Sequence, residues 1–333
     1  TIPDVDVDAE VPVSALFNTT VANPSVPGVE LAIAGNTAKN SDGTSFTGKL
    51  SINPVPDYGR PESRPEELRP GMAVTIQPAG VRFNPPAPLT FPNTDNMPVG
   101  SELNLWSLSP DTGTFSIVGK MVVSGDGQSI VTVEGGVSAS AWHFALASSP
   151  APGDASTGST YCQSCRDTKV GSEADIEEGS LYLSHTLPSY RSLGQSRSLS
   201  LSYSSVTADP RPIISLNTTL SVRAAVPNSF STRLLVGGVQ QGGEIFTDTR
   251  SLPEDSDSTS RISAQFDASN LPTGRYPYQA TIFSNYQNSS IGGMTNGNVI
   301  VLNRKSSPLG SGWAISDLQQ LHIGQEGRGV ADE

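Results

Sequence analysis

Side chains that commonly carry catalysis are scarce in this sequence. Its 333 residues include only two cysteines and three histidines. His143, His185 and His322 are far apart, and none belongs to the His-x-x-x-His pattern of a helical metal site. The chain also lacks a Gly-x-Ser-x-Gly elbow, a phosphate loop and a dinucleotide fingerprint. These absences argue against an ordinary hydrolase or transferase, and we expect no cofactor and no metal.

Positive charge and long apolar runs are also scarce. The 20 Lys and Arg residues face 32 Asp and Glu residues, giving a formal net charge of −12. Nucleic acids and anionic membrane surfaces require basic patches, so neither is an expected partner. No apolar run approaches the roughly 18 residues of a membrane-spanning helix, and we expect no membrane insertion within this segment. The sequence shows neither an initiator methionine nor a leader, so we expect a processed piece of a longer, exported protein.

Glycine and proline are abundant instead, with 32 and 26 residues. Only 16% of the residues are charged, and this mixture favours short strands joined by turns over helices. Turn signals such as Asp42-Gly43 and Asp126-Gly127 separate alternating apolar segments, as in meander hairpins. The length suits about two domains. We therefore predict an all-β fold with two β-sandwich domains joined by a linker.

Changes in composition divide the chain into four parts. Residues 1–148 should form the first β-sandwich. Residues 149–168 are rich in Ser, Pro and Gly, as in a linker. Residues 169–305 carry regularly spaced strand signals that are typical of an immunoglobulin-like sandwich. Residues 306–333 change in character and should begin a further element.

Aromatic and aliphatic residues at alternating positions suggest which strand faces are buried. Phe115, Ile117 and Met121 share one parity and should fill the core of the first sandwich. Tyr276 and Tyr278 are two residues apart after a turn signal, and we expect them to anchor a late strand of the second sandwich.

The linker contains both cysteines, Cys162 and Cys165, as a Cys-x-x-Cys motif. Two thiolates supply half of a tetrahedral zinc site, and the chain has no second pair to complete it. A redox pair would require a helix directly after the motif, and the residues that follow are a poor helix start. A small disulfide clip in an oxidising compartment is the favoured interpretation, and metal binding is the alternative.

One short stretch, His143-Phe144-Ala145, has the appearance of a self-cleavage site. Cleavage by an N-to-O acyl shift requires a hydroxyl or thiol directly after the phenylalanine, and the histidine would assist proton transfer. Ala145 offers only a methyl group, so self-cleavage after Phe144 would need Ser in place of Ala145. We therefore expect no catalytic residue, with this stretch as the last strand of the first sandwich.

Residues 72–147 resemble the β-sandwich domain of zonula-occludens proteins, netrin receptors and ankyrins. The stretch "IQPAGVRFNPPAPLTFPN" and the terminal "WHF" carry this resemblance. Some members of that family cleave themselves at His-Phe-Ser, and this sequence departs from them at Ala145.

A second resemblance covers residues 177–205 and 306–323. The stretches "EEGSLYLSHTLPSYRSLGQSRSLSLSYSS" and "SSPLGSGWAISDLQQLHI" resemble the entry region of bacterial RHS/YD-repeat proteins, relatives of teneurins. In that family a strand pair precedes a spacer, and a Pro-Leu-Gly-x-Gly-Trp strand then opens a spiral β-shell. The matching residues are Ser307, Pro308, Leu309, Gly310, Gly312 and Trp313. The resemblance implies that residues 306–333 enter such a shell.

Together these features predict a structural or presenting N-terminal segment of a large bacterial protein, secreted or at the cell surface, that encloses a toxin or mediates adhesion. Its main partner would be the remainder of its own chain. One alternative is an autoproteolytic module that is degenerate or disabled at Ala145. Another is an adhesin that binds a host-surface protein or glycan through loop aromatics such as Tyr58 or Tyr286.

Overall fold

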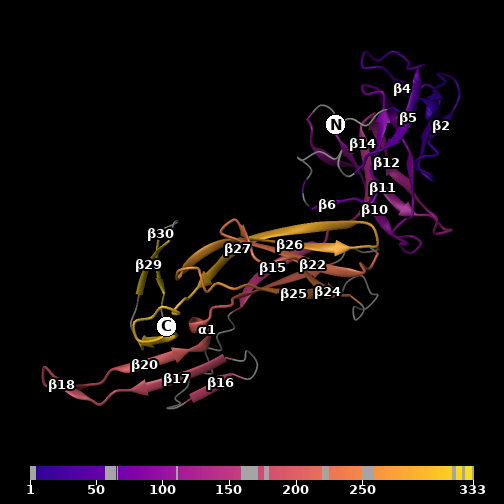
Figure 1. Ribbon diagram of the computed structural model, residues 1–333. Helices are drawn as coiled ribbons and strands as arrows, with labels where there is room; N and C mark the ends of the chain where they lie inside the picture. The colour runs from indigo at the N-terminus through magenta and orange to yellow at the C-terminus, as the bar shows by residue number, and fades with distance from the viewer. Residues whose placement is uncertain are drawn as a thin grey trace.

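The computed structural model is nearly all β-structure, which confirms the all-β prediction (Figure 1). It describes residues 5–56, 65, 67–109, 112–158, 172–175, 180–219, 225–249, 259–316, 320–324 and 327–331. None of the described helices is long and apolar enough to cross a membrane.

A ten-stranded antiparallel sheet dominates the first part of the chain, which is drawn in indigo and purple in Figure 1. In spatial order its strands are β1 (Val11–Pro12), β5 (Lys49–Pro54), β7 (Val74–Gln77), β14 (Trp142–Ala147), β10 (Glu102–Leu108), β11 (Phe115–Val123), β12 (Ser129–Gly135), β9 (Leu89–Pro92), β3 (Glu30–Ile33) and β2 (Thr19–Ala22). A smaller sheet contains β13 (Val137–Ala139), β8 (Arg82–Ala87) and β4 (Ala38–Lys39), and a 3₁₀ turn, η1, spans Val7–Ala9. The two sheets share one core, because side chains such as Leu31, Ile76 and Phe83 are almost fully buried. Burial of this apolar surface is the main force that holds the sandwich together.

The prediction that Phe115, Ile117 and Met121 share one face is wrong. Pairing between β10 and β11 passes over Val118, so this β-bulge changes the alternation of side chains along β11. Met121 is fully buried as a result, while Ile117 lies on the opposite face and is 51% exposed. Phe115 packs against the ring of Phe144, at a centroid distance of 5.5 Å.

The second sandwich consists of a three-stranded and a six-stranded sheet that share a second core. The first contains β15 (Ala151–Gly158), β21 (Ile213–Thr219) and β25 (Thr259–Gln265). The second contains β23 (Val239–Gln240), β22 (Ser229–Val236), β26 (Gly274–Asn285), β27 (Ser290–Val301) and β6 (Leu68–Arg69), with β24 (Ile245–Asp248) also paired to β22. Tyr278 is buried in this core and Tyr276 packs against it, which confirms the predicted aromatic pair. The Tyr276 hydroxyl donates to the carbonyl of Pro272 at 2.7 Å.

Two features of this part differ from the expected division of the chain. Residues 151–158, expected within the linker, form β15 and pair with β21. Residues 180–204, expected within the second sandwich, form a hairpin that belongs to a separate four-stranded sheet. Local composition predicted a linker over residues 149–168, but residues 151–158 of it pair with the distant strand β21.

The four-stranded sheet contains β16 (Ser172–Asp175), β17 (Ser180–Thr186), β20 (Ser200–Ser204) and β28 (Trp313–Ile315). Figure 1 shows it well apart from the first sandwich, at the other end of the molecule. The hairpin tip consists of β18 (Tyr190–Ser192) and β19 (Gln195–Arg197), and a single helical turn, α1 (Ser205–Ala208), follows β20. A final hairpin contains β29 (Gln320–Gly324) and β30 (Gly327–Ala331).

Candidate functional site at the joint between the sandwiches

A strand from the first part of the chain completes a sheet of the second sandwich. β6 pairs with β27 in the register Arg69 to Ser290 and Leu68 to Ile291. The amide of Gly292 also donates to the carbonyl of Glu67 at 2.8 Å. This strand lies in the charged, proline-rich segment "PDYGRPESRPEELRPG". Leu68, which is 5% exposed, is the one apolar signal in the stretch "PEELRPG" that could have revealed it.

Arg69 is the charged centre of the joint. Its guanidinium forms an ion pair with Glu244 at 2.6 Å and lies 3.8 Å from the ring centroid of Phe283. The Ser231 hydroxyl donates to the other carboxylate oxygen of Glu244 at 3.1 Å. The hydrogen bond from Arg69 lowers the pKa of Glu244, so this carboxylate stays ionised at neutral pH.

The turn between β26 and β27 docks on a loop of the first sandwich. Asp95 accepts hydrogen bonds from the backbone amide of Asn288 and, at 2.5 Å, from the Ser289 hydroxyl. The Asn288 side chain donates to the carbonyl of Thr94 at 2.7 Å, and Asn96 donates to Gln287 at 2.7 Å. These polar contacts fix the turn against the first sandwich.

Tyr286, at the same turn, is an internal anchor and not an exposed loop aromatic. It is 9% exposed, packs with the core of the first sandwich and donates its hydroxyl to the carbonyl of Ala225 at 3.1 Å. Burial raises the pKa of the Tyr286 phenol. Tyr58, the other tyrosine that the sequence suggested for adhesion, lies outside the described residues.

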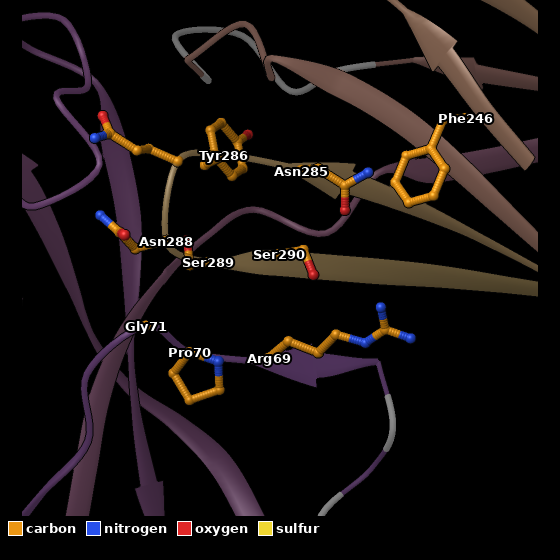
Figure 2. A pocket seen from close by; sticks show the side chains of 10 residues that line it. Arg69, Pro70, Gly71, Phe246, Asn285, Tyr286, Asn288, Ser289 and Ser290 are labelled. Atoms are coloured by element: carbon orange, nitrogen blue, oxygen red, sulfur yellow. The ribbon is translucent and has the colours of Figure 1, made fainter. Parts of the chain in front are cut away.

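An open cavity of about 450 Å³ lies in this joint (Figure 2). Its walls come from three separate segments: the end of β6, the turn between β26 and β27, and β24. The lining residues are Arg69, Pro70, Gly71, Phe246, Asn285, Tyr286, Gln287, Asn288, Ser289 and Ser290. Sequence reasoning missed this site, because its residues come together only when the two sandwiches meet.

The structure places His143-Phe144-Ala145 in the interior of the ten-stranded sheet. Trp106 pairs with Phe144 and Leu105 with Ala145, so the Phe144–Ala145 bond lies in a regular ladder between β10 and β14. His143 is fully buried, with Nε2 3.2 Å from the carbonyl oxygen of Ala139. Burial lowers its pKa to about 4, although contacts with backbone groups of Ala139 and Trp106 act in the opposite direction. A neutral, enclosed imidazole beside an alanine has no nucleophile to activate.

The Pro-Leu-Gly-x-Gly-Trp segment lies beside β20, which is at the end of residues 177–205, the first of the two stretches that resemble RHS/YD-repeat proteins. Tyr203 of β20 pairs with Trp313 of β28, and their rings are 5.5 Å apart. Gly312 has φ +79°, and a Cβ there would lie 2.7 Å from the Tyr203 ring. The Ser307 hydroxyl donates to the carbonyl of Trp313 at 2.6 Å, and Gly310 also has a positive φ. The motif is therefore a tight turn that places Trp313 in the four-stranded sheet. Pro308 and Leu309 form the exposed part of this turn.

Cys162 and Cys165 lie outside the described residues. Within the described part of the chain, no group of three or more His, Cys, Asp or Glu side chains is arranged to hold a metal ion. No family model matches the chain, and no curated protein matches it.

Proposed function

We propose that this chain is a structural, presenting segment of a large secreted or cell-surface bacterial protein of the RHS/YD-repeat type. Its two sandwiches form a support, and its four-stranded sheet packs against further β-structure of the same long protein. That protein would enclose a toxin or mediate adhesion.

An incompletely covered apolar face on the four-stranded sheet carries this proposal. Residues paired across neighbouring strands point to the same side of a sheet, so Leu183, Tyr203 and Trp313 share one face. Leu181, Leu201 and Ile315 lie on this face by the same register. Among the described residues, none of these six belongs to either hydrophobic core, and each is half-buried or exposed. An apolar face of this kind is typical of a surface that another layer of protein covers.

The hairpin that extends from this sheet has the same character. Leu187 and Leu199 are 37% and 38% exposed, Tyr190 is 56% exposed, and Leu193 at the tip is 93% exposed. Leu193 also adopts a positive φ of 53°, which is costly for a leucine. A bulky apolar side chain at a strained, solvent-facing turn does not stabilise this chain. A contact between Leu193 and another protein surface explains its presence better.

The arrangement of the family-like segments also supports the proposal. β20, at the end of residues 177–205, and β28, within residues 306–323, are neighbours in one sheet. A spiral of β-structure that continues from both segments would require this arrangement. The Phe144–Ala145 bond lies in a regular strand pair and is followed by no hydroxyl or thiol, which favours a support over an autoproteolytic module.

The proposal is tested by determining whether the natural protein continues after Glu333, and with which sequence. Sequencing of the gene, with peptide mass spectrometry of the exported protein, should show tandem Tyr-Asp repeats after the final hairpin. A natural chain without such repeats would refute the family assignment and the β-shell that it implies.

A further inference from the structure

The cavity in the joint has an aromatic ring at its mouth. Phe246, on β24, is 67% exposed, and its ring stands at the rim (Figure 2). Its neighbours Ser231 and Asn285 lie on adjoining strands of the same sheet. Leaving a phenylalanine ring exposed beside polar groups costs solvation free energy that contact with a ligand would recover.

Polar side chains line the floor next to this ring. The Asn285 amide nitrogen donates to the hydroxyls of Ser229 and Ser231, at 3.3 and 3.1 Å, so its orientation is fixed by two bonds. Its amide oxygen points toward Ser290 (Figure 2), whose residue is 8% exposed and lies on the same floor. The cavity therefore offers an ordered acceptor and a hydroxyl beside an apolar ring.

Arg69 is the one charged residue among the described residues that line the cavity. The guanidinium groups of Arg69 and Arg233 both lie near the Phe283 ring, at 3.8 and 5.7 Å. The Glu244 carboxylate pairs with Arg69, and the Asp95 carboxylate binds the turn residues of the opposite wall. The ion pair with Glu244 neutralises the guanidinium of Arg69 at the cavity wall, and the chain as a whole has a net charge of −12, which repels anionic ligands.

The walls are also held in place before any ligand arrives. Gly71 lies so close to the turn that a Cβ there would be 2.7 Å from the carbonyl oxygen of Asn288. Arg69, on β6, is paired with Ser290 in the sheet. A cavity with fixed walls loses little conformational entropy on binding.

We propose that this cavity binds a neutral saccharide, as a site of one or two sugar units. The apolar C–H face of a pyranose ring would stack on Phe246, and its hydroxyls would bond to the Asn285 amide oxygen and the Ser290 hydroxyl. A hexose ring has both an apolar face and a rim of hydroxyls, which matches this combination of an aromatic ring and ordered polar groups. The site is independent of the proposed support role, since it uses neither the four-stranded sheet nor its apolar face.

Binding of defined neutral oligosaccharides to the whole 333-residue chain tests this inference. The probes are cellotetraose, maltotetraose, laminaritetraose and chitotetraose at millimolar concentration, measured by saturation-transfer difference NMR and calorimetry. At least one of these probes should bind. Phe246→Ala should weaken the affinity for it roughly tenfold, because one aromatic contact contributes about this much to affinity. Phe246→Trp should retain binding because it keeps the aromatic platform.

The matched control is Phe17→Ala, because Phe17 is also highly exposed, at 73%, but belongs to the first sandwich far from the cavity in sequence. Its affinity should equal that of the wild type. Absence of binding by all four probes, or equal affinity of Phe246→Ala and wild type, would overturn the proposal. Tighter, salt-sensitive binding of a sulfated oligosaccharide would overturn the assignment to neutral sugars.

Discussion

Arg69 in the first part of the chain and Phe283 in the second sandwich form a cation–π contact, with 3.8 Å between guanidinium and ring centroid. The same guanidinium pairs with Glu244 at 2.6 Å. This one side chain therefore links β6, a strand from the first part of the chain, to two elements of the second sandwich.

Replacement of Arg69 by alanine should weaken the joint. We expect a loss of about 1–2 kcal/mol in the free energy of unfolding, because a partly buried ion pair and a cation–π contact are removed together. Differential scanning calorimetry should show the unfolding transition broaden or divide into two. Arg211→Ala is the control, since Arg211 pairs with Asp209 at 3.0 Å but both side chains are more than half exposed. Equal effects of the two substitutions would contradict a special role for Arg69.

Gly312 should be among the least replaceable glycines of the described chain. Gly312→Ala combines a positive φ with a Cβ only 2.7 Å from the Tyr203 ring, and we expect a loss of at least about 2 kcal/mol. Urea unfolding followed by tryptophan fluorescence measures it. Gly243→Ala, where a Cβ meets nothing within 4 Å, should be nearly neutral. A neutral Gly312→Ala would show that the turn before Trp313 is not tightly packed.

Ala145→Ser should give an intact protein. The new hydroxyl would follow Phe144 in a paired strand, beside an imidazole that is neutral and fully buried, so no group is placed to strain the bond or move the proton. A denaturing gel after several days at neutral pH should show one band. Two fragments that divide after Phe144 would support the autoproteolytic interpretation.

Acid should weaken the first sandwich through His143. Unfolding returns this imidazole to its ordinary pKa of 6.5, whereas in the folded protein it stays neutral down to about pH 4. The unfolded state therefore binds more protons in this window, and the free energy of unfolding should fall by about 3 kcal/mol as the pH drops from 6.5 to 4. Urea unfolding at several pH values should show this slope in the wild type and in His185→Gln. His143→Gln should remove it, and an unchanged slope in that variant would assign it to other groups.

The fold class could be predicted from the sequence because turn residues and alternating apolar residues are local signals. The pair Tyr276 and Tyr278 was found for the same reason, since two residues of one strand face the same core. Ile117 was misplaced because a β-bulge depends on the partner strand and leaves no mark in its own sequence.

The joint could not be predicted, because it depends on contacts between distant parts of the chain. Arg69 and Glu244 are 175 residues apart, and nothing in either neighbourhood marks them as partners. β15 was missed in a similar way, since its strand pairing with β21 comes from the second sandwich and not from its own Ser, Pro and Gly composition.

In the proposed function, the apolar face with Leu201, Tyr203 and Trp313 packs against later residues of the same protein. Amide hydrogen exchange of residues 200–204 and 313–315 should be compared between this 333-residue chain and the longer protein that the proposed function implies. We expect at least tenfold slower exchange in the longer protein, about 1.4 kcal/mol of added protection. Equal exchange rates in the two proteins would contradict it.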